Sequence, residues 1–317
     1  MKVEYKSQPL KQNWDQELPK YWFDNSPFKT HFMNALSIMI PVSEYIVLHT
    51  LKETQPLLTD LELKAQVSHM IAQENWHSFS HKKYNIWLER MDLPAVELSS
   101  NWLVSIISGK KKADKMFGAS FWLPVIVAGE HSAACFMEYF LERPALLQQM
   151  HPHFRQAWLW HFIEEIEHKG SSMEMWHDTK QIYNRKKWKL NLAHLVQGVR
   201  FHSTVLQYTF TLLNRDKQLW KWKTFKDGMS FIFGRDGLFF NTAGQWCRLF
   251  GKNFNPWDHD TRYLIAQYQK IIDVEAISPE RLQEIEEEFK GCVADTEAII
   301  AENNKKSDNN KSGIHII

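Results

Sequence analysis

The sequence predicts an all-α protein: a four-helix bundle with a crossover connection and additional C-terminal helices. Three observations carry this prediction. The 317 residues include only 12 Gly and 11 Pro, which leaves few tight turns for a sheet-rich fold. Hydrophobic residues make up 44% and charged residues 24%, as in an ordinary globular core and surface. Helix-start signals such as Ser26-Pro27 precede long apolar stretches.

The first helix is expected over residues 27–53, with Pro41 inside it as a kink or a break in the hydrogen-bond ladder. Thr59-Asp-Leu-Glu62 fits a capping box and predicts a second helix over 59–91. Residues 92–116 combine Pro94 with a lysine-rich run, so we interpret them as a crossover connection containing at most a short helix.

A third helix is expected over 117–142, with Pro124 inside it, and a fourth from His151-Pro152 to about Gly170 and on to Thr179. Further helices are expected at 186–213, 236–250, 257–273 and 279–304, the last starting at Ser278-Pro279-Glu280.

These elements suggest four parts of the chain. They are an irregular lead-in at 1–25, a metal-binding helical domain at 26–250 whose core bundle is 26–180, C-terminal helices packed on the bundle at 251–304, and a low-complexity, disordered tail at 305–317.

Composition excludes several classes of partner. The net charge of +1 gives no global field for nucleic acid. No uninterrupted apolar run reaches the length of about 18 that a membrane span needs. Three widely spaced cysteines indicate neither a disulfide framework nor a thiolate zinc site, and the N-terminus lacks a secretory leader. We therefore expect a cytoplasmic protein.

Two solitary acids stand out within the apolar helices. Glu44 is the only acidic residue between Thr30 and Lys52, and Glu130 is the only one between Phe117 and Met137. A carboxylate in such a helix is costly unless a cation or a hydrogen-bond network compensates it. The compensating group is either a metal ion or a bland partner such as an arginine or His131.

Helices two and four each carry a Glu-x-x-His motif, Glu74–His77 and Glu165–His168. Residues at i and i+3 lie on one helix face, so each pair can bind a common centre. The chain order Glu, Glu-x-x-His, Glu, Glu-x-x-His matches the ligand order of dinuclear carboxylate sites in four-helix bundles, an arrangement already known from such proteins. A third motif, Glu174–His177, lies about 180° round the helix from Glu165 and is left out.

His161 precedes Glu165 by one turn and offers a seventh ligand, with His81 as a rival on helix two. Each histidine also has an ordinary interpretation as a packed core or helix-face side chain. His131 and Glu164 flank the motif face and are expected to orient ligands. The residues alone predict six ligands, Glu44, Glu74, His77, Glu130, Glu165 and His168, and leave a seventh open.

Over residues 26–250 this pattern resembles two known groups. The PVSE segment at Glu44, ENWH at 74–77 and HFIEEIEH at 161–168 resemble a bacterial family of predicted metal-dependent hydrolases and the ferritin-like di-iron superfamily. The HxxxExxH segment is also similar to di-iron arylamine N-oxygenases, whose extra histidine completes a set of three His and four Glu. These resemblances imply a ferritin-like bundle and seven ligands, namely Glu44, Glu74, His77, Glu130, His161, Glu165 and His168.

An oxygen and nitrogen ligand set without thiolate suits two Fe ions, with Mn or Zn as alternatives. The bulky neighbours favour an O₂-dependent oxidase or oxygenase that acts on a small apolar or aromatic substrate; they are Ile40, Leu48, Trp76, Ile126 and Trp158. An external reductant would supply the electrons. Ala133 and Ala134 leave room for that substrate. The alternatives are a hydrolase that uses a metal-bridging water, and iron or manganese binding without turnover.

Segment 217–226 mixes lysines with Trp220 and Trp222. It has two interpretations, contact with a membrane surface or a solvated linker whose tryptophans dock on the bundle, and we favour the linker. A homodimer is left open.

Overall fold

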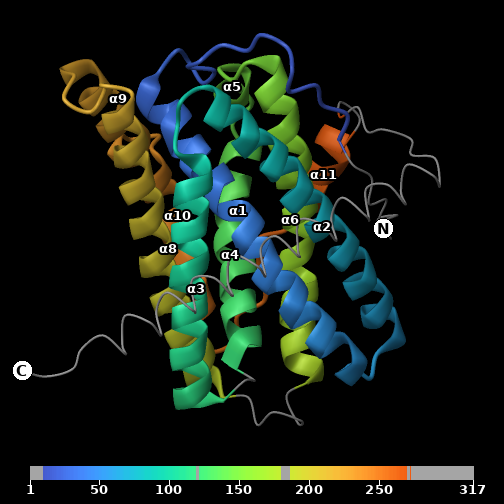
Figure 1. Cartoon of the computed structure of the whole chain (residues 1–317). Helices are drawn as coiled ribbons and strands as arrows, with labels where there is room; N and C mark the ends of the chain where they lie inside the picture. Colours follow the sequence, from blue (N-terminus) through green and yellow to red (C-terminus); the bar gives the residue numbers. More distant parts are fainter. Residues whose placement is uncertain (1–9, 119–120, 180–185, 270–271, 273–317) are drawn as a thin grey trace, which may run out of the picture.

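The computed structural model describes residues 10–118, 121–179, 186–269 and 272. These residues form helices joined by short connections and contain no β-strand (Figure 1). The all-α prediction is therefore confirmed. Within the described residues the α-helices are α1 (Pro27–Thr54), α2 (Leu61–Arg90), α3 (Ala95–Phe117), α4 (Trp122–Leu141), α5 (Pro144–Gln148), α6 (Pro152–Asp178), α8 (Lys187–Arg215), α9 (Trp222–Phe233), α10 (Leu238–Cys247) and α11 (Arg262–Tyr268).

The central bundle consists of α1, α2, α4 and α6. Helix α1 packs along α2, α4 packs along α6, and α8 covers both α1 and α4. The chain crosses from α2 to α4 through α3, which lies against α1 and α2 (Figure 1). This arrangement places four long helices around one shared interior.

Helix α1 begins as predicted. Ser26 is its N-cap and accepts a hydrogen bond from the Lys29 amide, with Pro27 in the first turn. Pro41 lies in the middle of the helix and lacks the N–H that would bond the Ser37 carbonyl. That carbonyl instead accepts a 3.1 Å hydrogen bond from Asn85 Nδ2 on α2. The interrupted ladder of one helix is thus completed by its neighbour.

Two predicted helix starts are displaced. Asp60, not Thr59, caps α2, because its Oδ1 accepts from the amides of Glu62 (2.8 Å) and Leu63 (3.2 Å). Thr59 donates instead to Asp178 at the end of α6. Helix α4 begins at Trp122, so Pro124 lies in its first turn, where a missing N–H costs little, rather than within the helix.

The crossover connection contains a long helix where a short one was expected. Helix α3 has 23 residues, and Leu98, Trp102 and Ile106 recur every fourth position on its buried side. The lysine run at its C-terminal end is solvent-facing helix rather than loop.

In the C-terminal half, α8 and α10 match their predicted positions, and 256–268 holds a short 3₁₀ turn and α11. Helix α9 was not predicted. The prediction that Trp220 and Trp222 dock on the bundle is wrong, because these side chains are 91% and 74% exposed. Helix α9 packs instead through Thr224, Gly228 and Phe231. The predicted helix 279–304 and tail 305–317 lie outside the described residues, and the domain boundaries stay predictions.

One apolar helix passes a length and hydropathy test for membrane spans. The segment Pro27–Leu57, which contains α1, qualifies, and 89% of its most apolar window is buried inside the protein. A central helix of a packed bundle meets the same criteria, so this is weak evidence for a span.

Candidate metal centre

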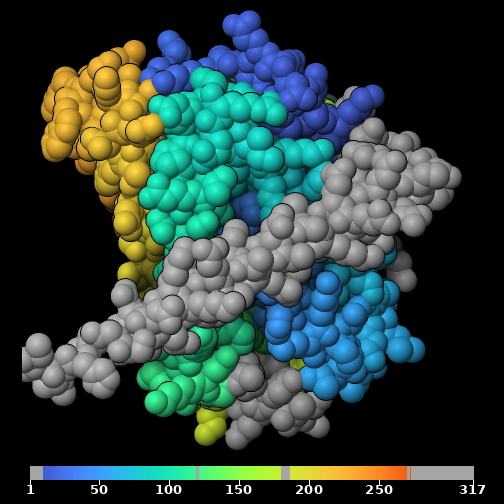
Figure 2. Space-filling model, in the orientation of Figure 1, coloured from blue at the N-terminus to red at the C-terminus, as the bar shows by residue number. Residues whose placement is uncertain are grey.

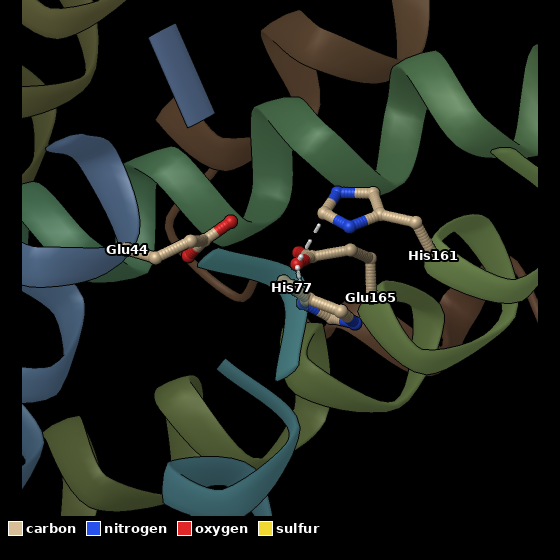
Figure 3. Close-up of side chains that lie close together, drawn as sticks. All are labelled: Glu44, His77, His161 and Glu165. Atoms are coloured by element: carbon tan, nitrogen blue, oxygen red, sulfur yellow. Dashed lines mark ion pairs between the residues drawn. The ribbon is translucent and has the colours of Figure 1, made fainter. Parts of the chain in front are cut away.

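All seven predicted ligand residues point into the interior shared by the four central helices. Glu44 comes from α1, Glu74 and His77 from α2, and Glu130 from α4, while α6 supplies the rest. None of the seven is more than 6% exposed. Their ligand atoms form two groups, each with all atoms within 4.8 Å of one another: Glu44, His77, His161 and Glu165; and Glu74, Glu130, Glu165 and His168. Figure 3 shows the first group.

Glu165 belongs to both groups, and its two oxygens face different histidines. Oε1 lies 3.2 Å from His77 Nδ1 and 3.7 Å from His161 Nε2 (Figure 3), whereas Oε2 lies 3.7 Å from His168 Nδ1. A carboxylate placed in this way has one oxygen available to each of two neighbouring cations.

Glu74 has a similar arrangement from the opposite helix. Its Oε2 lies 3.4 Å from His77 Nδ1 and its Oε1 lies 3.1 Å from His168 Nδ1. The two motif glutamates therefore both span the space between the two motif histidines. Because α2 and α6 each contribute one Glu-x-x-His motif, the centre has an approximate two-fold character, which His161 on α6 breaks.

The outer nitrogens of the two motif histidines are held by residues of the facing helix. His77 Nε2–H donates to Glu164 Oε2 on α6 at 2.9 Å, and His168 Nε2–H donates to Gln73 Oε1 on α2 at 3.0 Å. The Gln73 amide in turn donates to Glu167 at 3.2 Å. Such partners fix the orientation and tautomer of a ligating imidazole. Gln73 and Glu164, which contact the two imidazoles, each come directly before a motif glutamate.

Burial and mutual repulsion dominate the electrostatics of the cluster. Burial, with repulsion from Glu74 and Glu165, raises the pKa of Glu44 well above its usual value. Burial and the charges of Glu165 and Glu74 do the same for the pKa of Glu130. Burial alone would raise the pKa of Glu165 too, but contacts with His168 and His77 hold it well below its usual range.

The residues fit a bound cation by a direct criterion. Among the described residues, Glu74 Oε1, Glu130 Oε2 and His168 Nδ1 are buried and form no hydrogen bond, although Glu74 Oε1 and His168 Nδ1 lie 3.1 Å apart. His161 Nδ1 is also buried without a hydrogen bond, while Nε2 of the same ring is the atom that lies near Glu165. Buried polar atoms are rarely left unpaired in native proteins. None of the ion pairs within the described ranges joins a lysine or arginine to these carboxylates.

The alternative partners are placed elsewhere. His131 Nε2 faces the carbonyls of Gln245 (3.1 Å) and Trp246 (3.3 Å), and no hydrogen bond found within the described residues joins His131 to the seven clustered residues, so nothing supports its expected orienting role. His81 is outside both groups and its Nδ1 bonds Ser37 Oγ at 2.9 Å. Glu174 is exposed, in keeping with its exclusion.

Sequence reasoning identified the clustered residues and Glu164 but missed Gln73. A glutamine one position before a Glu-x-x-His motif gives no signal by itself. The corresponding position before the second motif is Glu164, and comparison of the two motifs would have pointed to Gln73. The assignment of the seven residues as ligands stays a prediction.

The predicted apolar neighbours of the centre are all buried, namely Ile40, Leu48, Trp76, Ile126 and Trp158. A small cavity borders Ala134, but its other walls include Glu138, Lys169 and Phe254 and none of the seven clustered residues.

Comparison with known proteins gives one match. A family model described as "Predicted metal-dependent hydrolase" matches residues 7–260. No curated protein and no solved structure matches the chain.

Proposed function

This chain belongs to the family of predicted metal-dependent hydrolases, and we propose that it is an enzyme holding two metal ions between α1, α2, α4 and α6. One observation carries the proposal. Glu74 and Glu165 each direct one oxygen to His77 and the other to His168. The seven clustered residues would hold the ions, and Glu74 and Glu165 would each offer one oxygen beside His77 and the other beside His168.

The donor set favours iron. Four carboxylates and three imidazoles form a hard-to-borderline oxygen and nitrogen environment that suits Fe or Mn, with Zn as an alternative. Neither cysteine of the described residues, Cys135 or Cys247, belongs to either group. Gln73 and Glu164 hold the two imidazoles so that both Nδ1 atoms face the centre.

We further propose that the reaction is an O₂-dependent oxidation of a small apolar or aromatic substrate, with electrons from an external reductant. When bound, two iron ions would supply the electrons for O₂ activation, whereas two redox-inert ions would supply an acidified water for hydrolysis. The burial of the cluster and the packing of Trp160 on His77 and of Trp158 on His161 support the first, because they restrict water and favour apolar molecules. The family description favours the second and makes hydrolysis the alternative.

Metal analysis tests the centre itself. Protein from iron-replete cells should contain about two metal ions per chain, as a dinuclear site requires, and the Glu165→Ala variant should lose most of them. Glu174→Ala is the matched control, because it alters an exposed Glu-x-x-His motif on the same helix. Equal metal content in wild type and Glu165→Ala would refute the proposed site.

Spectroscopy separates the reactions. Anaerobic loading with Fe(II) followed by addition of O₂ should change the optical and Mössbauer spectra. The protein should consume fewer equivalents of Fe(II) per chain than a storage protein would. Absence of an O₂-dependent change, together with ester hydrolysis by Zn- or Mn-loaded protein, would replace oxidation by hydrolysis. A cage-sized assembly that takes up iron without limit would indicate storage.

A further inference from the structure

Helix α9 lies at one corner of the molecule (Figures 1 and 2), and exposed apolar side chains gather on α9, the turn before it and the start of α10. We call this surface the α9–α10 patch. Its rings form two groups of contacting side chains: Trp222 stacks on Phe225 with centroids 5.5 Å apart, while Phe233 lies 5.7 Å from Phe239 and Phe239 lies 5.4 Å from Phe240. The exposed members are Trp220, Trp222, Phe225, Met229, Phe233, Phe239 and Phe240.

The patch is held in place by the other side of α9. Thr224, Gly228 and Phe231 are buried, and Phe231 packs edge-on against Phe32 with centroids 5.4 Å apart. Gly228 approaches Phe28 so closely that a Cβ there would lie 2.5 Å from the ring. The exposed stripe follows at positions 222, 225, 229 and 233, one helix face at ~100° per residue. Helix α9 is thus fixed by one apolar face and exposes a second.

Positive charge is concentrated around the exposed stripe. Residues 217–240 hold five basic side chains against two acidic ones, a net charge of +3, while the whole chain carries only +1. Lys221, Lys223 and Lys226 are all exposed beside the aromatic residues. The apolar stripe and the basic residues therefore occupy the same corner.

From this juxtaposition we infer that the α9–α10 patch binds the surface of an anionic phospholipid bilayer, with α9 lying in the plane of the interface. Amphipathic helices that combine Trp and Phe with flanking lysines bury their apolar face at the boundary of headgroups and acyl chains. Tryptophan is enriched at that depth, and each nearby lysine gains from the negative surface potential.

A second copy of the chain fits the patch less well. In a two-fold dimer the same surface meets itself, which would place two clusters of charge +3 face to face. The inference does not rest on the proposed metal chemistry, because the clustered carboxylates lie on α1, α2, α4 and α6 and none lies on α9 or α10.

Vesicle co-sedimentation of the full chain tests the charge requirement. We expect binding to vesicles containing phosphatidylglycerol and much weaker binding to phosphatidylcholine alone. Lys221→Gln/Lys223→Gln/Lys226→Gln should weaken partitioning by roughly 100-fold, since each lysine contributes about fivefold near an anionic surface. The control is the same change at Lys111, Lys112 and Lys115, exposed lysines near the end of α3. Equal losses in both triple variants would overturn the inference.

A second pair of variants tests the apolar requirement. Trp220→Ser/Trp222→Ser/Phe225→Ser should weaken partitioning at least about tenfold, whereas Leu61→Ser/Val96→Ser/Met116→Ser, which changes exposed apolar residues elsewhere, should not. Lipids with brominated acyl chains should quench part of the wild-type tryptophan fluorescence, and Trp220→Phe/Trp222→Phe should abolish this quenching while binding persists.

Two results would overturn the inference. One is binding to anionic vesicles that the serine variant retains in full. The other is a dimer, seen by analytical ultracentrifugation without lipid, that the serine variant dissociates, since this would assign the patch to a second copy.

Discussion

Replacing Glu44 with glutamine should stabilise the metal-free protein while weakening its affinity for metal. Burial and the nearby carboxylates of Glu74 and Glu165 raise the pKa of Glu44 well above the ordinary value of 4.5 for a glutamate. Between that value and the raised pKa the folded chain binds more protons than the unfolded chain, so stability falls as the pH rises through this window. Glutamine keeps the shape, lacks the charge, and removes this loss.

The size of the effect follows from the environment of the side chain. Glu44 is 6% exposed and forms no ion pair with a lysine or arginine within the described residues. Relieving an uncompensated buried polar group is worth about 1–3 kcal/mol, which corresponds to a rise in Tm of a few degrees for a chain of this size. In metal-loaded protein the sign should reverse, because the first group loses one of its four members.

Thermal unfolding with and without chelator measures both signs, and Glu138→Gln provides the contrast. Glu138 is equally buried but pairs with Lys169 Nζ at 2.5 Å. Leaving that lysine without its partner should cost about 3–5 kcal/mol, with or without metal. If Glu44→Gln also destabilised the chelator-treated protein, the carboxylate cluster would be a structural network and the argument for a cation would fail.

Three further predictions concern Gln73, His131 and Gly228. Gln73→Leu removes the acceptor of His168 Nε2–H and should lower metal affinity 10- to 100-fold, measured by chelator competition. Burial lowers the pKa of His131 to about 4, so wild-type stability should fall by up to about 3 kcal/mol as pH drops from 6.5 to 4, and less in His131→Gln; a constant difference between the two urea titrations would contradict this. Gly228→Ala should cost about 1–3 kcal/mol through its clash with Phe28, whereas Gly244→Ala, with nothing within 4 Å, should not, as melting curves will show.

Much of the candidate site could be predicted because its residues break a local rule. Glu44 and Glu130 are conspicuous as lone acids in apolar helices, and paired motifs at i and i+3 fix which faces must meet. Gln73 escaped notice because an amide on a polar helix breaks no rule. Its role depends on the approach of α6, a tertiary fact that no local pattern encodes.

The missed helices have a comparable explanation. In α3 the signals from Pro94 and the lysine run outweighed the weaker recurrence of Leu98, Trp102 and Ile106. In α9 the lysines suggested a linker, and the buried residues Thr224 and Gly228 carry little hydrophobic signal. Both helices are stabilised by the neighbours they pack on, and propensity alone gives a weak indication of such elements.

The shared hydrogen bond between Asn85 and the Ser37 carbonyl also sets the register of α1 against α2. If one helix moved past the other by a turn, the buried Ser37 carbonyl and the buried Asn85 amide would both lose their hydrogen-bond partner. Apolar packing alone imposes no such cost on a shift in alignment. Pro41 thus helps to fix the alignment of α1 against α2, and with it the position of Glu44 relative to Glu74 and His77. An alanine at position 41 would let α1 complete its own ladder, and the two helices would lose the contact that fixes their alignment.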